Sequence, residues 1–257
     1  MKNILFLIIL VYSINCMGQE AFKPIKAQIY HWDEAIVQKK ETMEQRTLLE
    51  GSTVDFKHFK IHATTVYPNQ APHPSHAHDE EELIIVKSGT LTVNIANKAY
   101  TLEKGSIALI FSGDTHGLEN KSDSAVTYYV IRYESKAPKN LERGQQAGGS
   151  FVVHWNNVPF QAHDKGGIRK FFDKPTSMTK RFEMHVTTLN EGLESHPPHT
   201  HRAAEILLPL DNIAEESING NWIKARKGDI IFLESNIPHA IKNTGKGTVT
   251  YFAFQFE

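Results

Sequence analysis

The sequence of this chain repeats itself with a constant offset of 123 residues. Aromatic residues, glycines, asparagines and histidines all recur at that distance: His31-Trp32 as His154-Trp155, Phe59 as Phe182, Gly105 as Gly228, His116 as His239, and Asn120 as Asn243. Because the offset never changes, the two halves align without an insertion or a deletion. The repeat therefore predicts two copies of one domain, an N-terminal copy over residues 30–134 and a C-terminal copy over residues 153–257.

Two segments lie outside this repeat. Residues 135–152 are rich in Lys, Gln, Gly and Ser, which is typical of a linker between domains. Residues 19–29 precede the first copy, and we expect them to pair with the other half as an edge strand.

Short apolar runs separated by turn residues predict an all-β fold. Residues 83–86 are apolar and residues 90–95 alternate between apolar and polar, with the turn residues Ser88-Gly89 between them. Residues 106–111 and 126–131 are two further predicted strands. Helical patterns are limited to single turns near 33–36 and 156–160, so an antiparallel sandwich or barrel is expected in each copy.

The N-terminus has the pattern of an export signal. Lys2 is followed by an apolar run over residues 4–12, too short for a membrane span of roughly 20 residues, and then by Cys16-Met17-Gly18. We expect residues 1–18 to be removed before Gln19 and the protein to be periplasmic or secreted. The competing interpretation is a lipoprotein anchored through Cys16, although residues 13–15 match a lipobox poorly.

Composition excludes several functional classes. The 28 basic and 29 acidic residues give a net charge of −1 and a pI near 6.9, so no attraction to nucleic acid or to an anionic membrane is expected. No later stretch is apolar enough for a transmembrane segment. Cys16 is the only cysteine, so neither a disulfide nor a catalytic thiolate is expected after cleavage.

Each copy carries three histidines and one glutamate at matching positions. The first ligand set is His76, His78, Glu82 and His116, and the second ligand set is His199, His201, Glu205 and His239. Two histidines that are two residues apart on a strand point to the same face. A lone histidine is ordinarily a packed or surface residue, but the agreement of residue type, spacing and duplication favours metal binding in both copies.

Three imidazoles and one carboxylate suit a divalent transition metal, with Mn or Fe preferred and Ni, Cu or Zn also compatible. Four protein ligands leave coordination positions for water, dioxygen or a chelating substrate, as a catalytic metal requires. We therefore expect up to two ions per chain. A duplicated site can also keep a purely structural role in one copy.

The spacing of these residues resembles the two signature motifs of the cupin superfamily, G-x5-H-x-H-x3,4-E-x6-G and G-x5-P-x-G-x2-H-x3-N. In the first copy the motifs cover residues 76–89 and 105–120. The resemblance implies a bicupin, with two tandem double-stranded β-helix (jelly-roll) barrels that each hold a metal. Length and duplication are also loosely similar to those of ureidoglycine aminohydrolase-type bicupins.

The departures from these motifs fall at turn positions. Phe111 and Glu234 stand at the motif proline, Asn212 and Asn236 replace glycines in the second copy, and the leading glycine is missing in both copies. All eight proposed ligands are retained. We therefore expect altered loops and intact metal sites.

Several polar residues flank the ligand sets. His73 and His196 precede the first ligand by three residues and are candidate catalytic acid–base groups, with a polar loop position as the alternative. Arg132, a third catalytic candidate, becomes Gln255 in the second copy; it would pair with a substrate carboxylate if it faced inward. The carboxylates of residues 79–81 are expected to form a solvated rim.

Two functions from different classes follow. In the first, the chain is a metalloenzyme that chelates a small oxygen-rich substrate, such as a carboxylate, ureide or sugar acid, while a nearby residue moves a proton. The resemblance implies a dioxygenase, decarboxylase, isomerase or hydrolase. In the alternative, the chain is a non-catalytic cupin that binds a carbohydrate or small ligand outside the cytoplasm with a structural metal. Assembly into a homo-oligomer is compatible with both.

Overall fold

The computed structural model describes residues 22–257, which are almost entirely β-structure. Their single α-helix is α1 (Leu141–Gln146), and the short 3-10 turns η1 (Trp32–Glu34) and η2 (Trp155–Asn157) begin each copy. The predicted all-β class is therefore confirmed. The expected signal peptide, including Cys16, lies outside the described residues. Within the described part of the chain, no helix is long and apolar enough to cross a membrane.

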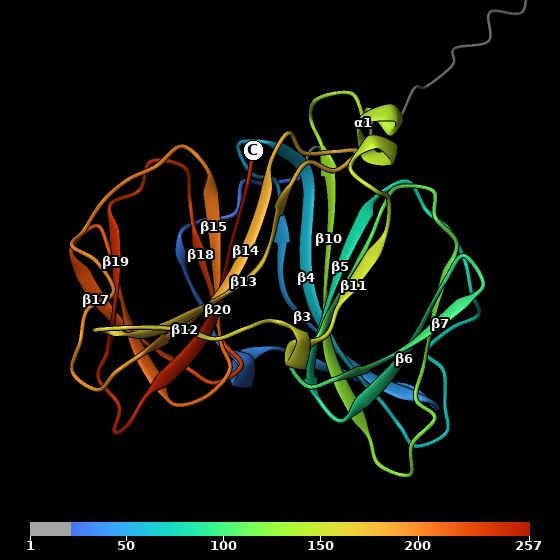
Figure 1. Cartoon of the computed structure of the whole chain (residues 1–257), viewed down its shortest axis with the longest axis horizontal. Helices are drawn as coiled ribbons and strands as arrows, with labels where there is room; N and C mark the ends of the chain where they lie inside the picture. The colour runs from blue at the N-terminus through green and yellow to red at the C-terminus, as the bar shows by residue number, and fades with distance from the viewer. Residues whose placement is uncertain (1–21) are drawn as a thin grey trace, which may run out of the picture.

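The first barrel consists of a seven-stranded sheet and a three-stranded sheet, both antiparallel (Figure 1). The large sheet has the order β11-β8-β5-β10-β4-β3-β2 and the small sheet the order β7-β6-β9. The strands of the large sheet are β2 (Val37–Lys39), β3 (Met43–Gly51), β4 (Phe56–Val66), β5 (Glu81–Ser88), β8 (Ile107–Ile110), β10 (Val126–Ser135) and β11 (Phe151–Val153). Those of the small sheet are β6 (Thr90–Ile95), β7 (Lys98–Glu103) and β9 (His116–Glu119).

The second barrel repeats this arrangement. Its large sheet has the order β1-β18-β15-β20-β14-β13-β12 and its small sheet the order β17-β16-β19. The large sheet contains β1 (Gln28–Tyr30), β12 (Gln161–His163), β13 (Gly166–Lys174), β14 (Phe182–Leu189), β15 (Ala204–Pro209), β18 (Ile230–Leu233) and β20 (Val249–Phe256). The small sheet contains β16 (Ile213–Ile218), β17 (Asn221–Arg226) and β19 (His239–Asn243).

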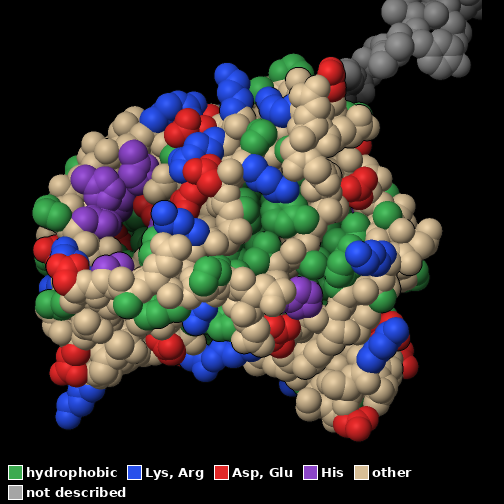
Figure 2. All heavy atoms as spheres, in the orientation of Figure 1, with side chains coloured by type: hydrophobic (Ala, Val, Ile, Leu, Met, Phe, Trp, Pro, Cys, Tyr) green, Lys and Arg blue, Asp and Glu red, His purple; other side chains and the backbone are tan. Residues whose placement is uncertain are grey.

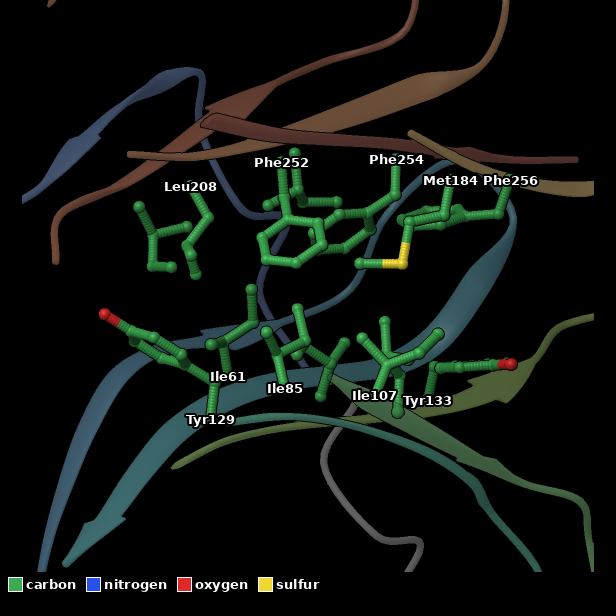
Figure 3. Packing of buried hydrophobic residues seen from close by; sticks show 14 of the residues in the cluster. Ile61, Ile85, Ile107, Tyr129, Tyr133, Met184, Leu208, Phe252, Phe254 and Phe256 are labelled. Carbon is green, nitrogen blue, oxygen red and sulfur yellow. The ribbon is translucent and has the colours of Figure 1, made fainter. Parts of the chain in front are cut away.

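The two large sheets face each other at the centre of the molecule, and the small sheets lie on the outside (Figure 1). Strand alternation directs one set of side chains into each barrel and the other set toward the opposite half. On β5, for example, Ile84 and Val86 fill the first barrel, whereas Leu83 and Ile85 join the central cluster. Figure 3 shows this cluster, in which Ile61, Ile85 and Ile107 oppose aromatic residues of β20.

The barrels exchange edge strands. Strand β1, which precedes the first copy, pairs with β18 of the second barrel, as expected for the lead-in, and β11 pairs with β8 of the first barrel. The repeated tryptophans follow these strands: Trp155 lies over Gly105, and Trp32 lies over Gly228. Each large sheet is therefore completed by the other half of the sequence.

The segment between the copies is more ordered than a simple linker. The Asn140 side chain caps helix α1 by accepting a hydrogen bond from the Arg143 backbone amide at 2.9 Å. The Arg143 guanidinium in turn donates hydrogen bonds to the carbonyl oxygens of Thr176 and Ser177 in the second half. The segment expected to be a linker thus contains α1 and β11 and is bound to both barrels.

Asparagine preserves the turns in which the second copy lacks motif glycines. Gly89 and Gly113 have φ angles of 78° and 86°, and Asn212 and Asn236 at the equivalent positions have 53° and 60°. Asparagine is among the residues that tolerate this left-handed region best. The departures from the motif therefore leave the backbone path unchanged at these turns.

Candidate metal centre

The first two histidines of each ligand set lie outside the regular strands, contrary to the expectation from their spacing. They occupy an extended loop between β4 and β5, or between β14 and β15. Backbone hydrogen bonds attach this loop to the strand of the third histidine, because His76 and His116 exchange amide–carbonyl bonds of 2.9 and 2.8 Å. His199 and His239 do the same at 3.1 and 3.0 Å.

The loop brings three imidazoles together in each barrel. In His76, His78 and His116, one ring nitrogen of each lies within 4.8 Å of the others, and His199, His201 and His239 form the same group. The third histidine, His116 or His239, is buried, and the second, His78 or His201, is half-buried. Each group thus reaches from the barrel interior toward its mouth.

The hydrogen bonds of the rings leave a nitrogen available to a metal. The Nδ1 atoms of His78 and His116 lie 3.0 Å from the carbonyl oxygens of Glu80 and Asp114. A carbonyl only accepts, so Nδ1 carries the proton and Nε2 carries the lone pair. The buried Nε2 atoms of His78 and His116 have no hydrogen-bond partner among the described residues. Such backbone-oriented imidazoles are typical of metal ligands.

The second group is built in the same way. The Nδ1 atoms of His201 and His239 donate to the carbonyl oxygens of Ala203 and Ile237, each at 2.8 Å. The Nε2 atoms of both residues then face Glu205, whose Oε2 lies 3.1 and 3.2 Å away. The residues of this chain therefore fit a divalent transition metal at both positions.

Glu82 and Glu205 complete the two ligand sets from the start of β5 and β15. Glu82 lies 3.3 Å from His78 Nε2 and 3.7 Å from His116 Nε2. In the absence of a metal, burial alone would raise the pKa of Glu205, but hydrogen bonding from the His201 ring, whose own pKa Glu205 raises, lowers it to about 2. Despite burial, the pKa of Glu82 is also lowered, chiefly by the neighbouring His78 side chain, so both carboxylates are anionic near neutral pH, as ligation requires.

His73 and His196 lie at the outer edge of the ligand sets. Their rings stand edge-on to His76 and His199, with centroids 4.5 and 4.2 Å apart. Each Nδ1 lies close to the carbonyl oxygen of the following proline, so this part of the loop is also folded on itself. In Figure 2 histidine side chains gather in a surface patch on the second half.

Arg132 faces the interior of the first barrel. Its Nη2 lies 2.9 Å from Glu80 Oε1, and its Nε lies 3.8 Å from Glu82 Oε2. The prediction that the carboxylates of residues 79–81 form a solvated rim is wrong for Glu81. This residue is buried on the face of β5 that points away from the first barrel's interior, and it accepts a hydrogen bond from the Ser177 amide at 2.8 Å. That face of β5 contacts the second half instead of water.

The second ligand set opens into a cavity of about 180 Å³. His199, Glu205 and His239 line it, and so does the buried Glu216 of β16. Motif spacing did not identify Glu216. The signal that would have found it is the alignment of the halves, where the equivalent residue of the first copy is Val93.

Comparison with protein families agrees with this geometry. The model of the cupin domain matches residues 63–132 and again residues 185–254, together more than half of the chain. The chain belongs to the cupin family. The two matches fall on the two barrels, so the protein is a bicupin with tandem jelly-roll barrels.

Solved structures with the same arrangement cover nearly the whole bicupin. The protein Ylba from E. coli has a TM-score of 0.71 at 16% identity, covering 96% of this chain and 98% of that one. The oxalate decarboxylase of Lactobacillus farciminis, solved as a formate complex, has a TM-score of 0.68 at 12% identity, covering 90% and 86%. At these identities the likeness shows the fold alone.

Curated relatives match a smaller part of the bicupin. The HTH-type transcriptional activator RhaS of Shigella sonnei is 28% identical over 90 residues, which are 34% of this chain. RhaS of Escherichia coli strains matches to the same extent. The bicupin spans about a third of the length of these relatives, since the match covers 32% of each.

Proposed function

We propose that this bicupin is a metal-dependent enzyme that acts on a small oxygen-rich molecule such as a carboxylate, ureide or sugar acid. The observation that carries the proposal is the duplicated histidine geometry, in which backbone carbonyls fix Nδ1 and direct Nε2 toward a carboxylate. A divalent ion held there would supply Lewis acidity and a chelation point. Mn or Fe is the proposed ion, and Ni, Cu and Zn suit the same donors.

The residues around each ligand set would orient the substrate. His73 and His196 lie beside the first ligand at the outer edge of the loop, within reach of solvent, so they are the proposed acid–base groups. Inside the second barrel, His185, Thr187 and Ser195 add polar groups to the cavity wall. These groups would fix the orientation of a small molecule in the cavity.

Metal content tests the proposal directly. Mature protein reconstituted separately with Mn(II), Fe(II) or Zn(II) should hold about two ions per chain by elemental analysis, as the two ligand sets require. H76A/H78A should lose the first ion and keep the second, and H199A/H201A should do the reverse. The exposed His163 lies outside both sets, so H163A should keep both ions. Protein that binds no ion under these conditions would contradict the proposal.

The second candidate function is non-catalytic binding with a structural metal, and one observation favours it for the first barrel. Arg132 is already paired with Glu80, so it is not free to bind a substrate carboxylate. Turnover of a panel of carboxylates, ureides and sugar acids by the metal-loaded protein distinguishes the candidates. A binder would bind members of the panel without turnover, and removal of its metal would lower only its stability and affinity.

We also propose that the protein is exported and processed before Gln19. The support is the sequence pattern of residues 1–18, with one lysine followed by a short apolar run. Mass spectrometry of the protein isolated from its native host should give a chain that begins at Gln19. A lipidated N-terminus at Cys16 would show that the competing interpretation is right.

A further inference from the structure

Glu216 is a buried carboxyl group without a partner. It lies on β16 between Ala214 and Ile218, which belong to the apolar interior of the second barrel. Its exposed fraction is 0%, and neither carboxyl oxygen has a hydrogen-bond partner within residues 22–257. A buried polar group in this condition destabilises a protein and calls for an explanation.

The first barrel shows that packing does not require this carboxyl group. The equivalent strand β6 places Leu91, Val93 and Ile95 in its interior, and all three belong to one apolar cluster. Val93 stands where the second copy has Glu216. The second barrel therefore retains an acidic residue at a position where the same fold accepts valine.

The Glu216 side chain lines the cavity of about 180 Å³ that contains His199, Glu205 and His239. Ala253 lines the same cavity at the position where the first barrel has the larger Val130, and Gln255 replaces Arg132. The smaller Ala253 side chain leaves space that Val130 fills in the first barrel, and the Arg132–Glu80 ion pair of the first barrel has no counterpart in the second. Because ligand sites for drug-sized molecules measure roughly 300–1,000 Å³, this cavity suits a smaller molecule.

The chemistry of Glu216 defines what such a molecule must offer. Burial between apolar neighbours, with no hydrogen-bond partner among the described residues, favours the neutral form of Glu216 and raises its pKa. A carboxyl group that keeps its proton is a hydrogen-bond donor, and it does not repel an anion. The natural partner of a buried donor is an acceptor oxygen, as in a carboxylate or a carbonyl.

We propose that Glu216 donates a hydrogen bond to an oxygen of a small carboxylic acid bound in this cavity beside the second ligand set. The proposal rests on the metal-dependent function above and adds a ligand-binding residue outside the metal ligands. It also assigns the two barrels different ligand preferences, since Val93 offers no such donor.

The test compares two chelating probes in the mature H76A/H78A protein, in which only the second set can hold Mn(II). Oxalate has oxygens beyond those that chelate, whereas acetohydroxamate chelates through two oxygens and ends in a methyl group. Calorimetric titration of E216V should show oxalate binding weakened at least tenfold, roughly what one such hydrogen bond supplies, and acetohydroxamate binding unchanged within about twofold. E216Q, which keeps a donor of similar shape, should retain most of the oxalate affinity.

Stability and metal content separate this proposal from its alternatives. E216V should bind Mn(II) as its parent does and should melt at the same or a higher temperature, because it loses an unpartnered buried carboxyl group. Equal weakening of both probes, or a loss of Mn(II), would show that Glu216 supports the fold or the metal and would overturn the proposal. A parent protein that binds no Mn(II) would instead overturn the proposed function on which this one rests.

Discussion

The guanidinium of Arg132 lies 2.9 Å from the carboxylate of Glu80 inside the mouth of the first barrel. The second copy has Gln255 and Ala203 at these positions, so both partners are replaced together. A half-buried charge that loses its partner is destabilising, whereas removal of both partners is less so. Only the first barrel therefore has this ion pair at its mouth, and its stability should depend on the pair.

The first prediction follows from that pair. R132Q and E80A should each lower the free energy of unfolding by about 1–2 kcal/mol, because each leaves a half-buried charge without its nearest partner. The double variant R132Q/E80A should be more stable than the sum of the single losses implies. Urea unfolding of the wild type, the two single variants and the double variant measures the coupling free energy between Arg132 and Glu80. If the two single losses add up to the double loss within about 0.3 kcal/mol, the ion pair contributes nothing to stability.

The second prediction concerns His62, which is buried on the inner face of β4. Burial lowers its pKa from 6.5 to about 4. The unfolded chain therefore binds one more proton than the folded chain between these pH values, so stability falls as the pH is lowered from about 6.5 to 4. The loss amounts to roughly 3 kcal/mol. H62Q should remove this part of the pH dependence, which chemical unfolding at several pH values measures; an unchanged profile would exclude His62 as its origin.

The third prediction compares two glycines. Gly105 has a φ of +84°, and a Cβ added there would lie 2.4 Å from the Trp155 ring. Gly228 has a φ of +97°, but the atoms nearest to a Cβ added there, in Lys87 and Trp32, would lie 3.3–3.4 Å away. G228A should therefore cost about 1–2 kcal/mol for backbone strain, and G105A about 1–3 kcal/mol more for the clash. Equal effects on thermal unfolding would mean that Trp155 moves aside freely.

The fourth prediction concerns the core between the barrels. Phe182 is fully buried there and contacts aromatic rings of both halves, including Tyr133 and Phe254. F182A should lower the free energy of unfolding by about 3–5 kcal/mol. Because the cluster is shared, both halves should still unfold in one transition followed by tryptophan fluorescence. Two separate transitions in the wild-type protein would contradict a common core.

The repeat carried most of the information about the fold. An invariant offset can only be satisfied by two copies with the same strand pattern, and the histidine spacing predicted which residues the structure brings together. The sequence does not show that the first two histidines of each set lie in a loop. Residues two apart point in the same direction in any extended segment, whether or not it belongs to a sheet.

The errors have a common physical cause. Alternation separates the two faces of a strand, but it does not say whether the second face meets water or another part of the protein. Glu81 was expected in solvent for that reason, although its face of β5 packs against the second half. A single acidic residue on a strand is ordinarily exposed, so the sequence around Glu216 does not predict burial, and only comparison with Val93 indicates that its side chain is directed inward.

The exchange of β1 and β11 relates the two halves as a twofold axis relates the subunits of a dimer. In two separate chains, the closing strand of each sheet would have to arrive by diffusion, and dilution would open both barrels. In this chain residues 135–150 link the two halves, so each closing strand meets its sheet at an effective concentration on the order of millimolar. Because both closing strands belong to the same molecule, neither barrel depends on protein concentration to stay closed.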